Sequence, residues 1–121
     1  MTEIYVAIDL DGTLAEYNGW KGLDHIGEPK PHARSGLEAV KEETDLKIII
    51  YTCRAENGLK RVRDWLEENS IPYDHINFNP EQPETAGKRK IWANYYIDDR
   101  NVNFHNLLES ISNLIKLENN R

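Results

Sequence analysis

Residues 4–13, IYVAIDLDGT, form an apolar run that ends in two aspartates one residue apart, followed at once by glycine and threonine. The run 4–8 is almost continuously apolar and favours β structure, which is typical of a strand buried on both faces of a parallel sheet. Open α/β folds bind their ligands at the carboxyl ends of such strands. We therefore expect Asp9 and Asp11 at the rim of a sheet, where Gly12 allows a sharp turn.

Two carboxylates at one rim are costly unless a positive group joins them. Like charges about 4 Å apart repel by roughly 4 kcal/mol at an effective dielectric constant of about 20. A hard divalent cation or a shared proton is the usual remedy. A strand followed by a simple turn would leave the same pattern, so the rest of the chain has to decide between these interpretations.

The composition narrows the class of protein. A chain of 121 residues suits one domain, 1–121, with a single core. Its net charge of −6 argues against tight, sequence-independent binding to a polyanion. Cys53 is the single cysteine, which rules out an internal disulfide framework, and we expect it to be a small core thiol. Neither a membrane-spanning stretch nor a signal segment is visible, so we expect a cytoplasmic protein without membrane contact.

The remainder of the chain alternates between strand and helix patterns. Apolar residues at helical spacing predict helices over 32–43, 57–69 and 104–115. Apolar or alternating runs predict further strands over 47–51, 73–78 and 91–97. Segments 14–31 and 79–87 contain glycine and proline and are predicted to be loops. This order predicts a three-layer, Rossmann-like α/β domain whose central layer is a mostly parallel sheet.

Polar residues follow the predicted strands at their carboxyl ends. Thr52 comes after the second strand, and Asp98 and Asp99 come after the last one. Parallel strands end at the same edge, so we expect these side chains to lie near Asp9 and Asp11. A lysine shortly before the last strand, Lys88 or Lys90, can reach the same crevice. Carboxylates for a cation, a hydroxyl and an ammonium group are suited to phosphoryl transfer.

In combination these residues resemble the haloacid dehalogenase (HAD) superfamily. The similarity consists of four ordered motifs over positions 4–100: Asp9-Leu-Asp-Gly-Thr13, Thr52, an upstream lysine and Asp98-Asp99. A closer resemblance is to small uncapped members of bacteria and phages. It lies in Gly-Trp-Lys-Gly at 19–22, Gly-Glu-Pro at 27–29 and Tyr-Ile-Asp-Asp-Arg at 96–100. The segments between the motifs hold only core elements and loops, so we expect no separate cap domain.

The resemblance implies roles for the acidic residues. Asp9 would be the nucleophile that forms an aspartyl-phosphate, and Asp11 would protonate the leaving oxygen and then activate water. Mg²⁺ would be held by the Asp9 carboxylate, the Asp11 backbone carbonyl and Asp98. Asp99 would bind the metal, directly or through water, or orient Asp98.

A second set of residues is predicted to bind the substrate phosphate. The resemblance implies that Thr52 hydrogen-bonds a phosphate oxygen, and Gly12 belongs to the same set. Lys90 lies eight residues before Asp98 and is the preferred phosphate-neutralising lysine, with Lys88 as its rival and a solvated loop as the alternative. Arg54 would either clamp the phosphate or form a surface salt bridge.

The expected activity is Mg²⁺-dependent hydrolysis of a phosphomonoester. The substrate class stays open between a small molecule, a nucleotide and a nucleic-acid end. Segments 11–19 and 97–100 also resemble the phosphatase domain of phage polynucleotide kinase, so a polynucleotide 3′-phosphatase or a nucleotide phosphatase is an alternative. A non-catalytic phosphate-binding module is another. Trp20 and Lys21 are candidates for substrate contact, and a homo-oligomer whose second subunit covers the open crevice is also compatible with the sequence.

Overall fold

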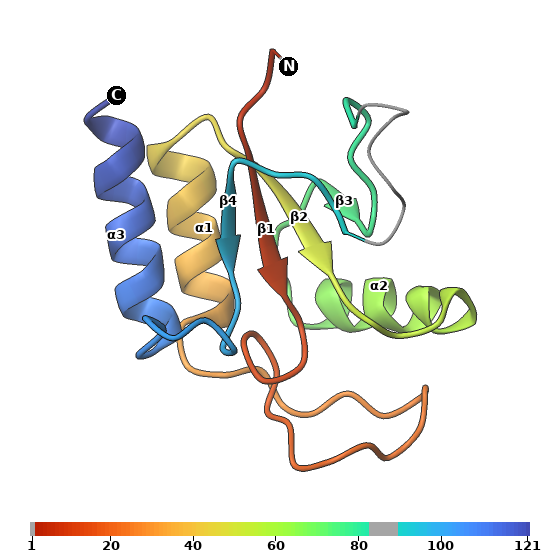
Figure 1. The fold of residues 1–121 in the computed structure, drawn as a ribbon. Coiled ribbons are helices and arrows are strands. Elements are labelled where there is room, and N and C mark those ends of the chain that lie inside the picture. The colour runs from red at the N-terminus through yellow and green to blue at the C-terminus, as the bar shows by residue number, and fades with distance from the viewer. Residues whose placement is uncertain (1, 83–89) are drawn as a thin grey trace.

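The computed structural model describes residues 2–82 and 90–121, and a four-stranded, all-parallel sheet lies at its centre (Figure 1). The strand order is β3-β2-β1-β4. The strands are β1 (Tyr5–Asp9), β2 (Lys47–Tyr51), β3 (His75–Ile76) and β4 (Tyr95–Ile97). The expected α/β class with a mostly parallel central sheet is therefore confirmed.

Strand β1 occupies the middle of the sheet and sets the position of the candidate site. Its register with β2 runs from Tyr5 opposite Lys47 to Asp9 opposite Tyr51. On the other side, Ile8 lies opposite Ile97 of β4. Asp9 is thus flanked by the end of β2 and by the residue that follows β4. Buried β-branched side chains on both sides explain why these short strands pair in a single register.

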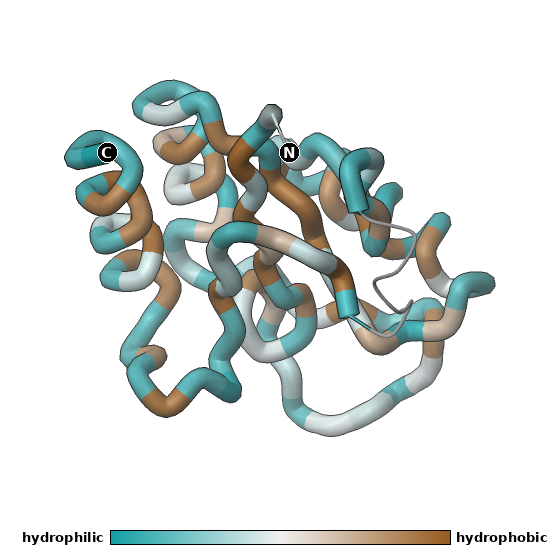
Figure 2. The backbone as a smooth tube through the Cα atoms, turned by 45° about the horizontal axis from the view of Figure 1, so that its top comes forward, coloured by the Kyte–Doolittle hydropathy of each residue, from teal (hydrophilic) through white to brown (hydrophobic). Residues whose placement is uncertain are grey.

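All three α-helices of the described residues pack on one face of the sheet: α1 (Ala33–Glu43), α2 (Leu59–Glu68) and α3 (Leu107–Asn119) (Figure 1). Alternate strand residues, Val6 and Ile8 among them, form one core with their buried side chains. In Figure 2 the central strands are brown over most of their length, whereas the helices alternate between brown and teal. Right-handed crossovers from β1 through β2 to β3 move in one direction across the sheet, which places α1 and α2 on the same side.

The opposite face has a different cover in the described residues. Tyr5, Ala7 and Ile49 point to this side and pack with Ala93 and the partly buried Ile91. Both covering residues belong to the extended segment that leads into β4. The third layer is therefore an extended segment in its described part, because the β3-to-β4 connection crosses the sheet in the opposite direction.

Two predicted strands are shorter in the structure than in the sequence pattern. β3 ends before Asn77, whose left-handed backbone (φ 49) turns the chain out of the sheet. β4 begins only at Tyr95, because the backbone of Trp92 bonds to side chains: its carbonyl accepts from Asn79 and its amide donates to Gln82.

The predicted final helix begins later than the apolar spacing indicates. The Asn106 side chain accepts a hydrogen bond of 2.8 Å from the Glu109 amide and caps α3 at Leu107. A 3₁₀ turn, Glu56–Gly58, precedes α2. Within the described ranges, no helix has the length and apolar character that crossing a membrane requires.

Candidate metal and phosphate site

The carboxyl ends of β1, β2 and β4 bring the predicted acidic residues to one edge (Figure 1). One carboxylate oxygen each from Asp9, Asp98 and Asp99 lies within 4.8 Å of the other two. Asp9 and Asp98 are partly buried and Asp99 is exposed. Oxygen ligands at this separation match what a hard divalent cation takes. The structure thus brings together three of the four predicted metal-binding aspartates.

The electrostatics of this cluster favour an added cation. Burial, together with the nearby charge of Asp98, raises the pKa of Asp9 to about 7, against an opposing hydrogen bond from Thr13. Burial alone would raise the pKa of Asp98 as well, but hydrogen bonds from the Tyr51 hydroxyl and the Arg100 amide lower it. A divalent cation would compete with a proton for Asp9, because its charge favours the ionised carboxylate.

Thr13 fixes the relative positions of the two acidic segments. Its buried hydroxyl lies 3.2 Å from Asp9 Oδ2 and 3.3 Å from Asp99 Oδ1, and it accepts a hydrogen bond of 2.9 Å from the Asp99 amide. Gly12 leaves room for this arrangement, because a Cβ there would lie 2.5 Å from Asp99 Oδ2 and its φ is +89°. The Gly12 amide donates to Ala15 O at 2.8 Å, and the phosphate-binding role of Gly12 stays a prediction.

Asp11 points away from the acidic cluster. Both of its carboxylate oxygens accept from Arg54, at 3.0 Å from Nε and 2.9 Å from Nη2. Arg54 is buried and also donates to the carbonyls of Leu23 and His25. The structure therefore shows a salt bridge for Arg54, as one of the two sequence alternatives had it, but a buried bridge to Asp11. A phosphate contact by Arg54 and a metal contact by the Asp11 carbonyl stay predictions.

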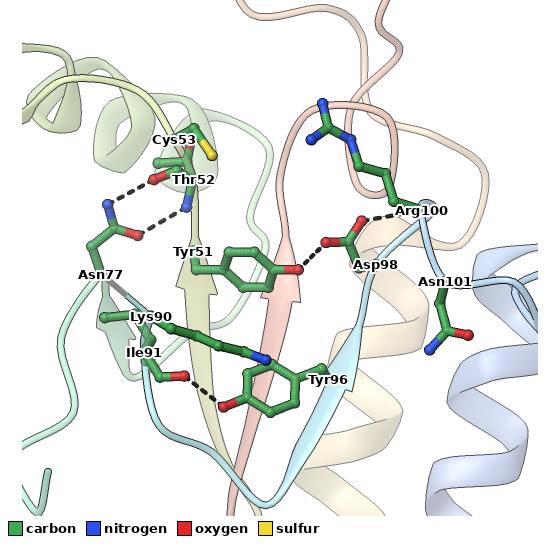
Figure 3. A pocket seen from close by; sticks show the side chains of 10 residues that line it. All are labelled: Tyr51, Thr52, Cys53, Asn77, Lys90, Ile91, Tyr96, Asp98, Arg100 and Asn101. Atoms are coloured by element: carbon green, nitrogen blue, oxygen red, sulfur yellow. Dashed lines mark hydrogen bonds between the residues drawn. The ribbon is translucent and has the colours of Figure 1, made fainter. Parts of the chain in front are cut away.

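Asn77 holds the end of β2 in place. Its side chain accepts from the Thr52 amide at 2.8 Å and donates to the Thr52 carbonyl at 3.0 Å (Figure 3). The Thr52 hydroxyl accepts from the Arg54 amide at 3.1 Å, which leaves its own proton available for an acceptor such as a phosphate oxygen. The structure thus places Thr52 in the cavity that Asp9 also lines, and its role as a phosphate donor stays a prediction.

Tyr51 lines two cavities at this edge. Its hydroxyl donates to Asp98, and burial together with that carboxylate raises the pKa of Tyr51, so the phenol stays protonated (Figure 3). One cavity has a volume of about 440 Å³ and is lined by Asp9 and Asp11, and the other has a volume of about 540 Å³. Both cavities are also lined by Thr52, Cys53, Asp98 and Arg100.

Lys90 lines the second cavity. Its Nζ lies 4.5 Å from the ring centroid of Tyr96, at a distance typical of a cation–π contact (Figure 3). Thr52 and Asp98 line the same cavity. Lys88, its rival as the phosphate-neutralising lysine, lies outside the described residues, so the choice between the two stays a prediction.

Several residues of this edge were not singled out by sequence reasoning. Thr13, Tyr51 and Asn77 contact the predicted residues through hydrogen bonds whose partners are up to 86 positions away. The position of Thr13 at the end of the acidic motif could have identified it as a site residue, whereas no sequence feature identified Tyr51 or Asn77. Cys53 was expected to be a core thiol, but it is exposed because it follows the end of β2.

Comparisons with known proteins address the fold. No family model matches the chain, and no curated protein does. A solved structure of a conserved protein from Bacteroides thetaiotaomicron superposes with a TM-score of 0.75 at 26% identity, covering 96% of this chain and 92% of that one. The fold is shared. A target protein from Vibrio cholerae, at 23% identity and a TM-score of 0.51, covers 95% of this chain and 98% of its own.

Proposed function

We propose that this protein is a Mg²⁺-dependent phosphomonoester hydrolase that forms an aspartyl-phosphate on Asp9. The observation that carries the proposal is the meeting of Asp9, Asp98 and Asp99 within 4.8 Å at the carboxyl edge of a parallel sheet. The hydroxyl of Thr52 lines the same cavity as these carboxylates. The HAD-like motifs of the sequence support the same activity.

The reaction has two steps on this chain's residues. A carboxylate oxygen of Asp9 attacks phosphorus, the bond from phosphorus to the leaving oxygen breaks, and Asp11 gives that oxygen a proton. Water then attacks the phosphorus of the aspartyl-phosphate, Asp11 takes a proton from the water, and the bond from phosphorus to Asp9 breaks. Inorganic phosphate and the free alcohol are the products.

Asp9, Asp98 and Asp99 are the residues that would hold Mg²⁺. A bound divalent cation supplies charge neutralisation for the phosphoryl oxygens and keeps Asp9 ionised. Thr13 orients Asp9 through its hydroxyl, and Thr52 supplies a donor for a phosphate oxygen. The chain's own contribution is to fix these groups on strand ends and on the first turn after β1.

The pairing of Asp11 with Arg54 favours a second candidate function, phosphate binding without catalysis. Both Asp11 oxygens accept from the guanidinium, and this ionised pairing leaves no proton to donate. Hydrolysis by the route above requires at least one of these hydrogen bonds to open when substrate binds. A binding module would keep them closed.

The test is a phosphate-release assay with Mg²⁺ on a broad panel of phosphomonoesters. We expect the wild type to hydrolyse at least one class and Asp9→Asn to lose the activity. Asp45→Asn, at an exposed position before β2, is the matched control and should retain it. Activity undiminished in Asp9→Asn would contradict the mechanism. Phosphate binding without hydrolysis of any ester would favour the binding module.

A further inference from the structure

Two aromatic side chains of the loop between β1 and α1 line the cavity that contains the carboxylates. Tyr17 and Trp20 contribute to this cavity of about 440 Å³ together with Asp9 and Asp11. Their exposed fractions are 46% for Tyr17 and 56% for Trp20. The size lies in the range of pockets that hold small ligands. The cavity therefore combines acidic side chains with two exposed aromatic residues, Tyr17 and Trp20, which we call the aromatic wall.

The indole of Trp20 contacts the guanidinium of Arg54. The guanidinium carbon of Arg54 lies 5.0 Å from the Trp20 ring centroid. The Arg54 side chain is only 3% exposed and is fixed by its pairing with Asp11. The same guanidinium thus contacts both the indole and the Asp11 carboxylate, while 56% of Trp20 stays exposed. Trp20 therefore contributes exposed aromatic surface to the cavity that Asp9 and Asp11 also line.

The loop that carries the wall is anchored at its base. The Glu16 amide donates to Glu28 O at 2.8 Å, and the Lys30 amide donates to Leu14 O at 2.8 Å. The Trp65 indole donates to Gly27 O at 3.0 Å. Stacking on a surface that is already formed costs less conformational entropy than ordering a mobile loop.

We propose that the leaving group of the substrate carries a planar aromatic ring, which stacks on Trp20 and Tyr17. The proposal rests on the proposed function for the position of the phosphate at Asp9. A ring attached to the phosphate through a short linker would leave the acidic cluster on the Asp11 side and meet the aromatic wall. A nucleobase and a simple aryl group share this chemistry. The net charge of −6 favours a small ester over a polynucleotide.

The test uses pairs of phosphate esters that differ in the ring. Adenosine 5′-monophosphate is compared with ribose 5-phosphate, and benzyl phosphate with cyclohexylmethyl phosphate. Values of kcat/KM are measured for the wild type, Trp20→Ala, Tyr17→Ala and Trp20→Tyr. Dissociation constants for the same compounds are measured by calorimetry on the inactive Asp9→Asn variant without Mg²⁺, with Trp20 intact and with Trp20→Ala. Trp92→Ala, at an exposed tryptophan outside this cavity, is the matched control.

We expect the wild type to prefer the ring-bearing member of at least one pair by about tenfold, the size of one base–aromatic stack. Trp20→Ala and Tyr17→Ala reduce that ratio, and Trp20→Tyr and Trp92→Ala keep it. The pair with the larger ratio identifies a nucleobase or an aryl group. A ratio near one in both pairs, or a ratio unchanged in both alanine variants, overturns the proposal.

The binding measurements separate this proposal from the proposed function. Turnover of no ester above the Asp9→Asn background contradicts phosphatase activity, yet a ring preference in binding that Trp20→Ala removes still supports the aromatic wall. Efficient turnover without any ring preference has the opposite meaning. It leaves the hydrolase mechanism intact and removes the assigned substrate class.

Discussion

The two sides of the candidate site differ in whether their carboxylates form salt bridges. On one side, Asp9, Asp98 and Asp99 gather carboxylates, and no salt bridge to them is present among the described residues. On the other, Asp11 and Arg54 form a bidentate salt bridge, and the guanidinium also satisfies two loop carbonyls. The first side groups oxygen atoms close enough to ligate one cation, whereas the second ties the aromatic loop to the sheet.

This difference separates residues that the sequence presents as equivalent. The chain contains two close aspartate pairs, Asp9 with Asp11 and Asp98 with Asp99. The structure instead groups Asp9 with the later pair and Asp11 with Arg54. Function and stability should therefore respond to different substitutions on the two sides.

The largest expected effect is on the acidic side. Asp98→Asn keeps the size of the side chain and an acceptor for Tyr51, but removes a charged ligand. We expect phosphate release to fall by about 10³-fold, because a catalytic metal contributes several kcal/mol. Tyr51→Phe, which keeps the carboxylate and removes only the hydrogen bond, should lose much less. Equal losses in the two variants, measured with saturating Mg²⁺, would assign the effect to the hydrogen bond.

The next effect belongs to the salt-bridged side and concerns stability. Arg54→Ala leaves the Asp11 carboxylate unpaired and frees two loop carbonyls, so we expect the free energy of unfolding to fall by about 3 kcal/mol. Arg34→Ala, which breaks an exposed pair with Glu38, should change it by less than about 1 kcal/mol. Urea unfolding measures both. Similar values for the two variants would show that the buried salt bridge stabilises little.

A smaller effect is expected from the hydroxyl that joins the two acidic segments. Thr13→Val keeps the shape of the side chain and removes its hydrogen bonds to Asp9 and Asp99. We expect Mg²⁺ affinity to fall by about tenfold, as for other residues that orient metal ligands. Calorimetric titration measures it, with Thr2→Val as an exposed control. An unchanged affinity would restrict Thr13 to a packing role.

The most gradual effect is a dependence of stability on pH. The pKa of Asp9 is raised to about 7 in the native state, above its ordinary value of 3.8. Between these values the native chain binds more protons than the unfolded chain, so the free energy of unfolding falls as pH rises towards 7. Mg²⁺ or Asp9→Asn should flatten this trend. Unfolding in chelator and in Mg²⁺ at several pH values checks it, and a trend that persists in Asp9→Asn would assign it to another group.

The sequence predicts the acidic edge for two reasons: each strand is visible as a short apolar run, and parallel strands always end at the same edge of a sheet. Apolar runs that end in Asp9, Thr52 and Asp98 are parallel strands, and parallel strands end together. The placement of all three helices on one face was not predictable, since it depends on the strand order, which periodicity does not contain. The sequence pattern overestimated the length of β4. The Trp92 backbone forms hydrogen bonds with the side chains of Asn79 and Gln82 instead of with a neighbouring strand, and the apolar pattern gives no sign of these bonds.

The salt bridge between Asp11 and Arg54 shows a second limit. Both residues were identified as chemically important, yet their partnership depends on how the loop 14–31 folds back over the sheet edge. The carbonyls of Leu23 and His25 accept from Arg54 and fix its direction. The spacing of these residues does not predict that path. The sequence alone therefore could not decide whether Arg54 binds phosphate or forms a surface salt bridge.

The central claim is that Asp9, Asp98 and Asp99 form the cation site on which catalysis depends. The most direct measurement is thermal unfolding as a function of Mg²⁺ concentration near pH 7.5, for the wild type, Asp9→Asn and Asp45→Asn. A ligand that binds only the native state raises the midpoint. We predict a rise for the wild type and for Asp45→Asn, and none for Asp9→Asn. The same rise in all three proteins would contradict the claim.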